Sequence, residues 1–357
     1  MSWRRSQRCG WACLFAVAAV ALVLLSHFIR DYILTGRQYL LQLQHKSVHR
    51  RIVALGDIHG DYEHATSILR AAGILHAGND SWAGGSTIFV STGDTVDRGD
   101  DTIRLYRLFQ DLREQSRRVG GNVINVLGNH EMMNAMMDWR YVTPGDMASF
   151  GGPVGRRQAM SLHGWLGMEW MQHYNVTMNV PLLPDPVAVY FPTQRASFVH
   201  GGITPAFAQI GVDAMNKDAH SLLTKALSAY EGDLINITKS EEALWLSNGP
   251  FWYRGYALDP HQHACATANR AIDALGVSSL IMGHTPHMSG IHARCAHGQI
   301  FIIDTGMSRA YGGRLSALEI DSYAEKRSWF TWCMTSTYSA VYVPEGRQVL
   351  HRAQRCV

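Results

Sequence analysis

The sequence predicts an α/β fold, and three observations support that prediction. Five short apolar runs end in glycine beside Asp, Asn or His, as expected for buried strands that lead into sharp turns. Helical patterns separate the first three runs, so strand and helix alternate along the chain. This alternation is typical of βαβ units in a parallel sheet. With 357 residues and 46% hydrophobic residues, the chain can form one large folded domain.

The first three strands are expected at Ile52 to Leu55, Thr87 to Thr92 and Val123 to Leu127. A helix from Asp61 to Ala72 follows the first strand, with the Asp side chain placed to cap its N-terminus. A second helix, Asp100 to Val119, follows the second strand and carries apolar residues on one face. It is expected to end at a pair of glycines.

Polar residues follow each strand at the same place. Gly-Asp-Ile-His follows the first, Gly-Asp the second and Gly-Asn-His-Glu the third, while His-Gly-Gly and Gly-His-Thr follow two later apolar runs. Ligands of parallel sheets bind beyond the carboxyl ends of the strands, so these side chains are expected to converge. Carboxylate, amide and imidazole groups without thiolates suit two divalent ions, such as Mn, Fe or Zn. The alternative is a set of ordinary Gly-Asp turns, which five such motifs in one chain disfavour.

The charge of the chain argues against nucleic acid as its main partner. The formal net charge is only +3, and the sequence contains no long block of Lys and Arg. A nucleic-acid-binding domain usually carries a strongly basic face. We therefore expect no nucleic acid partner, and the sequence does not fix the oligomeric state.

A charge-free stretch from Cys9 to Ile29 follows Arg4, Arg5 and Arg8. It is long enough for a helix to cross the hydrocarbon core of a bilayer. We expect a signal anchor, with a cleaved signal peptide and a buried soluble helix as the alternatives. The expected domain plan is a tail at 1–9, a transmembrane anchor at 10–29, a stalk at 30–50, and a catalytic domain at 51–357 with a helical insertion at 140–180.

Basic residues and export signals indicate the orientation of this anchor. Three arginines precede the stretch and two, Arg30 and Arg37, follow it, which favours a type II protein with a luminal or extracellular catalytic domain in the secretory pathway. Asn79, Asn175 and Asn236 each begin an N-glycosylation acceptor sequence. Four cysteines follow the stretch and are compatible with two disulfides, in three possible pairings, or with free thiols: Cys265, Cys295, Cys333 and Cys356.

The motifs resemble the phosphoprotein phosphatase branch of the calcineurin-like metallophosphoesterases. The matching stretches are GDIHG, GDTVDRG, GNHE, HGG and GHT, in that order, between Ile52 and about Leu318. GDTVDRGD, GNHEMMN, GHTPH and IDTGMS are similar to the bacterial-like group known as Shewanella-like phosphatases. The resemblance implies a β-sandwich flanked by helices. Thr95 stands where the animal serine/threonine phosphatases carry Tyr, so their inhibitor-binding surface and regulatory subunits are not expected here.

The resemblance also implies roles for individual residues. The implied metal ligands are Asp57 and His59 for the first ion, Asp94 as the bridge, and Asn129, His200 and His284 for the second ion. His130 resembles the general acid, Asp97 the carboxylate that orients its imidazole, and Arg98 a clamp for phosphate oxygens. Arg254 is a weaker match to a second clamp, and an ordinary surface arginine is the alternative.

The implied function is a membrane-anchored protein phosphatase with two divalent ions, Mn favoured and Fe or Zn as alternatives. It would hydrolyse phosphomonoesters, on phosphotyrosine, phosphoserine or phosphothreonine, by attack of a metal-bound hydroxide. One alternative is hydrolysis of dinucleoside polyphosphates or nucleotides. Another is a silent, membrane-tethered binding protein, which the complete set of motif residues disfavours.

Three further expectations concern residues around these motifs. Glu131 is expected to support the loop that presents His130. The segment from Met147 to Asn175 is expected to be a helical insertion over the site that could shape substrate choice. Asp304 ends an apolar strand, where a turn role is expected.

Overall fold

The computed structural model describes residues 46–229, 236–328 and 331–357. The predicted anchor at 10–29 lies outside these residues, as does most of the predicted stalk. None of the helices in the described ranges has the length and apolar character needed to cross a membrane. The first described strand begins at Ser47, so the folded domain starts before the boundary predicted at residue 51.

A seven-stranded mixed sheet forms one layer of the fold, with the strand order β12-β11-β10-β1-β2-β3-β4. Strands β1 to β4 are parallel to one another, as the alternation of strand and helix predicts, and β10 to β12 add an antiparallel meander beside β1. The strands are β1 (Ser47–Leu55), β2 (Ile88–Ser91), β3 (Asn122–Val126), β4 (Tyr174–Asn175), β10 (Ser316–Lys326), β11 (Trp332–Tyr342) and β12 (Gly346–Cys356).

A five-stranded sheet forms the second layer, with the order β5-β6-β7-β9-β8. Its central strands β6, β7 and β9 are parallel, and β5 and β8 pair antiparallel at the two edges. The strands are β5 (Thr177–Pro181), β6 (Arg195–Val199), β7 (Ser279–Met282), β8 (His292–Arg294) and β9 (Ile300–Ile302). Strands β6 and β7 are the two later apolar runs that precede the His-Gly-Gly and Gly-His-Thr motifs.

The helices connect and cover the strands. Asp61 caps α2, because its side chain accepts a hydrogen bond from the backbone N–H of His64 at 3.2 Å. The helices are α2 (Tyr62–Ala71), α3 (Thr102–Arg117), α4 (Asn129–Ala135), α5 (Pro144–Ser149), α6 (Pro153–Met160), α7 (Trp165–His173), α8 (Pro205–Ile210), α9 (Val212–Ser228), α10 (Lys239–Trp245), α11 (Gly255–Leu258) and α12 (His261–Leu275), with a 3₁₀ turn η1 (Val187–Tyr190).

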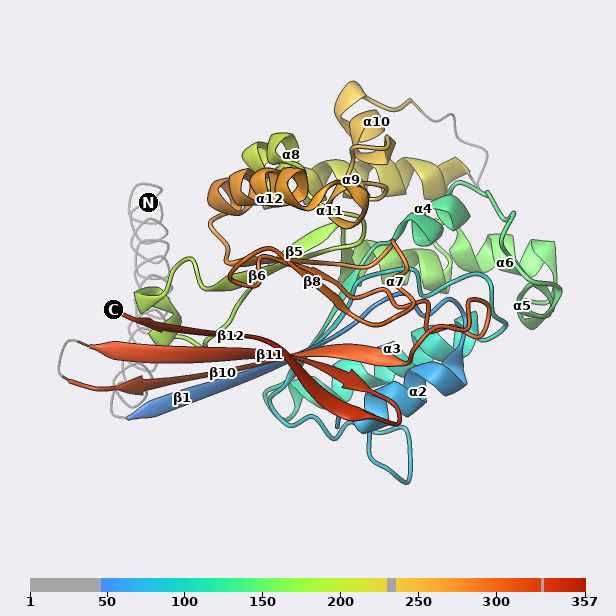
Figure 1. Ribbon diagram of the computed structural model, residues 1–357. Helices are drawn as coiled ribbons and strands as arrows, with labels where there is room; N and C mark the ends of the chain where they lie inside the picture. Colours follow the sequence, from blue (N-terminus) through green and yellow to red (C-terminus); the bar gives the residue numbers. More distant parts are fainter. Residues whose placement is uncertain (1–45, 230–235, 329–330) are drawn as a thin grey trace, which may run out of the picture.

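The layers are stacked as helices, sheet, sheet and helices (Figure 1). Helices α2 and α3 cover the outer face of the seven-stranded sheet, and α8 to α12 lie on the side of the five-stranded sheet (Figure 1). A buried cluster that includes Ile52, Phe198 and Leu318 fills the space between the two sheets. The predicted β-sandwich flanked by helices is therefore confirmed for the described residues.

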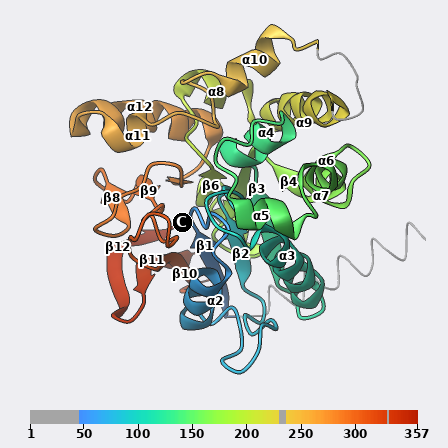
Figure 2. The same cartoon turned by 90° about the vertical axis from the view of Figure 1, so that its right-hand side faces the viewer.

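Helices α4 to α7 lie beside the ends of the central strands, with α4 and α7 also in contact with α9, and β1, β2, β3 and β6 lie at the centre of the view in Figure 2. The predicted insertion is thus helical, as expected, with α5, α6 and α7 inside the range 140–180. Because α4 follows β3 directly, it carries the Asn-His-Glu motif at its first turn.

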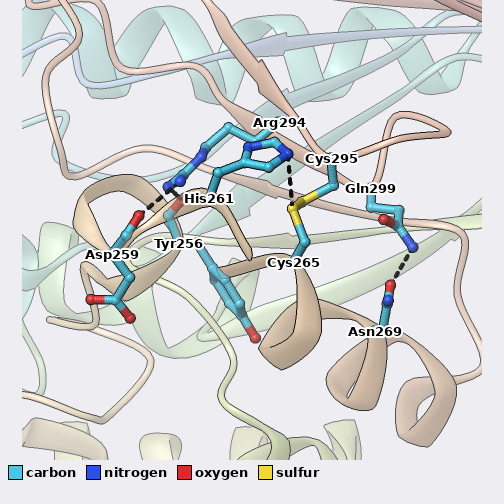
Figure 3. The surroundings of a disulfide bond; sticks show 8 residues. All are labelled: Tyr256, Asp259, His261, Cys265, Asn269, Arg294, Cys295 and Gln299. Atoms are coloured by element: carbon cyan, nitrogen blue, oxygen red, sulfur yellow. Dashed lines mark hydrogen bonds between the residues drawn. A yellow bond between two sulfur atoms is a disulfide. The ribbon is translucent and has the colours of Figure 1, made fainter. Parts of the chain in front are cut away.

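The four cysteines beyond the predicted anchor form two disulfides, Cys265–Cys295 and Cys333–Cys356. The first joins Cys265 of helix α12 to Cys295, the residue that follows β8, and an arginine directly precedes Cys295 (Figure 3). That arginine, Arg294, donates hydrogen bonds to the carbonyl oxygens of Tyr256 and Asp259. The disulfide therefore lies at a junction of three segments that are distant in sequence.

Candidate active site

Five of the predicted site residues share an unusual backbone conformation. His59, Asp94, Asp97, Arg98 and His284 all have positive φ, between 49° and 71°. Residues other than glycine rarely adopt this left-handed conformation, which costs about 1–3 kcal/mol per residue and is concentrated at functional sites. The turns after β1, β2 and β7 thus hold these five side chains in place at an energetic cost.

A cavity of about 80 Å³ opens between these turns. Residues from four of the five motifs line it, together with Arg254 and three aromatic side chains: Asp57, His59, Asp94, Arg98, Asn129, His130, Tyr141, Trp252, Arg254, His284 and Tyr311. His200 and Asp97 are fully buried behind this surface. The structure therefore brings together all ten residues that the sequence predicts for the site.

Acceptor atoms face one another in the half of the site around His200. Its Nε2 lies 2.8 Å from Asn129 Oδ1, 3.1 Å from His284 Nδ1 and 3.2 Å from Asp94 Oδ2. Its Nδ1 lies 2.9 Å from the carbonyl oxygen of Thr92, which can only accept, so Nδ1 carries the hydrogen. In neutral His200, Nε2 therefore presents a lone pair to two further oxygens. This arrangement suits a bound cation.

The ring of His59 is oriented in the same way as that of His200. Its Nδ1 donates to the carbonyl oxygen of Val96 at 3.1 Å, so Nε2 faces the carboxylates. Its Nε2 lies 4.0 Å from Asp57 Oδ2 and 3.8 Å from Asp94 Oδ2. Because Asp94 faces both His59 and His200, its carboxylate belongs to both groups of candidate ligands and would be shared if two ions were bound.

Two groups of buried side chains have ligand atoms within 4.8 Å of one another. One contains Asp94, His200 and His284, and the other contains His59, Asp94 and His130. His130 belongs to the second group by distance, but its Nδ1 is bound to a carboxylate and its Nε2 faces the cavity, 3.9 Å from Asp94 Oδ2. His130 is therefore already held by Asp97, whereas Asp57 Oδ2 lies 4.0 Å from the cavity-facing Nε2 of His59.

The pKa values in the site reflect this concentration of buried carboxylates. Burial alone lowers the pKa of His200, but Asp94 and Asp57 outweigh it and raise that pKa to about 10. Burial and the neighbouring carboxylate of Asp304 raise the pKa of Asp57 well above its usual value. Both shifts mark a site that lacks positive charge, which fits two divalent cations with oxygen and nitrogen ligands.

His130 and Asp97 form a buried pair next to the ligand residues. Asp97 Oδ2 accepts from His130 Nδ1 at 2.7 Å, which leaves Nε2 on the cavity side. The backbone N–H of His130 donates to Asp94 Oδ1 at 2.9 Å and fixes the start of α4. Burial lowers the pKa of His130, whereas Asp94 and Asp97 raise it, and the net result is a raised pKa. A buried imidazole with a raised pKa therefore lies beside Asp94.

Two arginines extend into the cavity from different segments. The guanidinium of Arg98 lies over the rings of Tyr141 and Tyr311, 4.4 Å and 5.0 Å from their centroids. Within the described residues, Arg98 Nε is buried without a hydrogen-bond partner. Arg254 donates to the carbonyl oxygen of His284 at 2.7 Å and to Thr285 Oγ1 at 3.1 Å. It lines the cavity and is only partly exposed, so it is not an ordinary surface arginine.

Glu131 has the supporting position that the sequence predicts. Its carboxylate accepts from the backbone N–H groups of Asp94, Thr95 and Gly128 at 2.8–2.9 Å, and from the Tyr106 hydroxyl at 2.9 Å. One fully buried carboxylate thus joins the turn after β2 to the turn after β3.

The sequence did not identify several residues that surround the site. Tyr141 and Tyr311 line the cavity from two loops. Asp304 makes the expected turn contact, accepting from the backbone N–H of Gly306 at 2.8 Å, but it also raises the pKa of Asp57. The fourth, Arg156, lies behind Asp97. Asp304 lies in the IDTGMS stretch, but no periodicity or motif marks the other three positions, because they reach the site only through tertiary packing.

Similar proteins agree with this fold and site. The family model described as calcineurin-like phosphoesterase matches residues 50–288. An uncharacterised protein of Schizosaccharomyces pombe is 38% identical over 272 residues, covering 75% of this chain and 76% of the relative. Shewanella-like protein phosphatase 2 of Arabidopsis thaliana is 28% identical over 291 residues, covering 72% of each chain.

Solved structures show the same fold. The crystal structure of a cold-active protein-tyrosine phosphatase of a psychrophilic Shewanella species aligns with a TM-score of 0.64, 21% identity, and coverage of 85% of this chain and 80% of that chain. The family match spans the whole set of strand-end motifs from β1 to the turn after β7. The chain therefore belongs to the calcineurin-like phosphoesterase family, with Shewanella-like protein phosphatases among its relatives, and is a metal-dependent phosphatase.

Proposed function

We propose that this chain is a membrane-anchored protein phosphatase that hydrolyses phosphomonoesters with two divalent ions, Mn²⁺ as the favoured pair. The observation that carries the proposal is the position of the His130–Asp97 pair beside ligand groups that share Asp94. The names of the relatives from Arabidopsis and from Plasmodium, both called Shewanella-like protein phosphatases, support phosphoproteins as the substrate class.

The proposed ligands are Asp57, His59 and Asp94 for one ion, and Asp94, Asn129, His200 and His284 for the other. Bound there, the ions would supply Lewis acidity and a nucleophile from water at neutral pH. The carbonyl oxygens of Val96 and Thr92 hold the two histidines with Nε2 toward the carboxylates.

The remaining residues act on the phosphate and the leaving group. Arg98 and Arg254 line the cavity and would bind the phosphate oxygens, since a guanidinium matches them with two parallel donors. His130 would give the proton on Nε2 to the leaving oxygen, while Asp97 holds the ring and stabilises its positive charge. Tyr141, Tyr311 and Trp252 line the same cavity and would pack against an aromatic leaving group, which favours phosphotyrosine.

Three substrates distinguish the proposed function from its alternatives. The purified protein is assayed with a phosphotyrosine peptide, a phosphoserine peptide and diadenosine tetraphosphate, each with Mn²⁺ and with chelator. We expect metal-dependent hydrolysis of the phosphopeptides, fastest for phosphotyrosine. Preferential hydrolysis of diadenosine tetraphosphate would replace the proposal with a nucleotide hydrolase, and no hydrolysis of any substrate would point to a silent binding protein.

We also propose that the anchor places the catalytic domain on the luminal or extracellular side. The two disulfides support this topology, because such bonds persist in oxidising compartments. Asn79 and Asn236 are exposed, as glycosylation acceptors must be. The Asn175 acceptor lies in β4 and is partly exposed.

Sealed microsomes test this topology. We expect the domain to resist added protease until detergent is present, and to shift on a gel after glycosidase treatment. The Asn236→Gln variant should reduce that shift. Digestion without detergent, together with the absence of any glycosidase-sensitive form, would place the domain in the cytosol.

A further inference from the structure

A buried series of polar contacts runs from the His130–Asp97 pair into the helical insertion and ends at Arg156 of α6. Arg156 is fully buried, although arginine is rarely so. Its Nη1 donates to Asp146 Oδ2 at 2.6 Å, and its Nη2 donates to Asn134 Oδ1 at 2.8 Å. Nη2 also lies 3.6 Å from Asp97 Oδ1. The mechanism above gives Arg156 no task.

The chemistry of these groups fixes which one donates and which one accepts in each hydrogen bond. A guanidinium can only donate, so Arg156 fixes the carbonyl oxygen of the Asn134 amide toward itself. The amide nitrogen of Asn134 then points the other way and donates to Asp97 Oδ1 and to the carbonyl oxygen of His130, both at 2.9 Å. Asp97 Oδ2 is left to accept from His130 Nδ1 at 2.7 Å.

The charges of the group explain why the arginine is needed. Asp97 and Asp146 are both fully buried carboxylates, and they share the single guanidinium of Arg156. A buried carboxylate without a partner is strongly destabilising. The group therefore keeps one unbalanced negative charge beside His130, which stabilises the imidazole when it carries the proton to be transferred.

We propose that Arg156 is a positioning residue for the general acid. It orients Asn134 and Asp97, so that His130 turns its Nε2 toward the cavity in a single orientation. The inference rests on the proposed phosphatase function, in which His130 protonates the leaving oxygen. It gives the helical insertion a part in the chemistry itself, in addition to any effect on substrate choice.

The variants are chosen to keep the protein folded. Arg156→Gln alone would leave two buried carboxylates without a cation, so it is combined with Asp146→Asn, which removes one charge of each sign. Asn134→Ala is the second variant, and it breaks the link to Asp97 while the Arg156–Asp146 pair remains.

A second buried ion pair serves as the matched control. Arg113 of α3 and Glu169 of α7 pair at 2.6 Å, both nearly inaccessible, and they also join the insertion to the rest of the fold. The double variant R113Q/E169Q therefore removes the same kind of buried ion pair from the insertion as D146N/R156Q does, but among the described residues neither Arg113 nor Glu169 makes a hydrogen bond or ion pair with His130 or Asp97.

The first readout is the dependence of kcat on the leaving group. We expect D146N/R156Q and N134A to lower kcat about 10-fold more for a phosphoserine peptide than for p-nitrophenyl phosphate, whose good leaving group needs little protonation, with KM unchanged. The control R113Q/E169Q should affect the two substrates equally. In a His130→Asn background D146N/R156Q should cause no further loss, because the residue it positions is gone. Equal losses for both substrates, or additive losses in that background, would overturn the proposal.

The second readout does not depend on activity. In protein labelled with ¹⁵N-histidine, the hydrogen-bonded Nδ1–H of His130 is assigned by its absence from the His130→Asn spectrum. We expect this resonance to shift or vanish in D146N/R156Q and to stay in place in R113Q/E169Q. An unchanged resonance in D146N/R156Q would overturn the positioning role even if no phosphomonoester were hydrolysed, whereas the absence of hydrolysis by the wild type would overturn only the proposed function.

Discussion

The two halves of the site are built in opposite ways. Around His200, the Nε2 atom faces the oxygens of Asn129 and Asp94 at 2.8 and 3.2 Å, and it offers them a lone pair when the ring is neutral. Between Arg156 and His130, by contrast, each contact joins a hydrogen-bond donor to an acceptor: Arg156 donates to Asn134, Asn134 donates to Asp97, and Asp97 accepts from His130. The ligand half therefore needs cations to be stable, whereas the protein assembles the acid half by itself. The two halves meet where the backbone N–H of His130 donates to Asp94 Oδ1, so each half is best perturbed through side chains on its own side of that contact.

The largest effect is expected from Asp94→Asn, because Asp94 is the carboxylate that faces both groups of ligands. Turnover should fall to the background rate, and fewer than two ions should remain bound per chain by metal analysis. Glu63→Gln, which changes an exposed carboxylate on α2, is the control and should keep both ions. An Asp94→Asn protein with near wild-type turnover and two bound ions would refute the ligand assignment. Chelator should abolish wild-type activity in the same way.

His130→Asn should lower kcat by about 10²–10⁴-fold, the usual contribution of a general acid. The bound metal should stay, because the acid half does not supply the ligands. The loss should be smaller with p-nitrophenyl phosphate than with a phosphoserine peptide, since a good leaving group needs less protonation. If metal content fell together with activity, His130 would belong to the ligand half, and the division of the site would be wrong.

Arg98→Ala should reduce kcat/KM by about 10- to 100-fold, as expected for loss of charge-assisted hydrogen bonds to a phosphate. Inhibition by inorganic phosphate should weaken in parallel, since the clamp binds the ground state as well as the transition state. Arg140→Ala, on the same side of the site but exposed and paired with Asp138, is the control. Unchanged KM and unchanged phosphate inhibition would remove Arg98 from the site.

The smallest effect is expected from Tyr311→Leu, which removes one of the two rings that face the Arg98 guanidinium. Cation–π contacts contribute about 0.5–2 kcal/mol, so phosphate inhibition should weaken by about 2- to 30-fold. Tyr311→Phe keeps the ring and should behave like the wild type. If the Phe variant lost as much as the Leu variant, the hydroxyl rather than the ring would be the important group.

The strand-end motifs were predictable because their signal is local. An apolar run followed by Gly-Asp or Gly-Asn-His specifies both a buried strand and the polar group at its carboxyl end, and the parallel pairing of β1, β2 and β3 then places these groups together. The helices α2 and α3 were predictable for the same reason. The meander β10 to β12 left no such signal, since its strands end in no chemical motif.

The acid half was only partly predictable. Asn134 lies four residues after His130 on α4, a spacing that places both on one face of a helix, so the sequence held a signal for it. Arg156 held none. It lies beside Arg157, which is exposed on the same helix, and only the packing of α6 against α4 and α5 distinguishes the two. The pairing of the four cysteines was likewise open until the positions of α12 and β8 were known.

The Cys265–Cys295 bond has a consequence for how this protein is handled. It closes a loop with a sequence separation of 30, and that loop contains His284. Closing a loop of this length removes about 3–4 kcal/mol of chain entropy from the unfolded state. Material produced in a reducing cytosol would lack this closure, and with it the covalent restraint on the loop that carries His284, a proposed ligand. The compartment of expression is thus an experimental variable in its own right, and each kinetic constant should be measured on material in which the state of the Cys265–Cys295 bond has been determined.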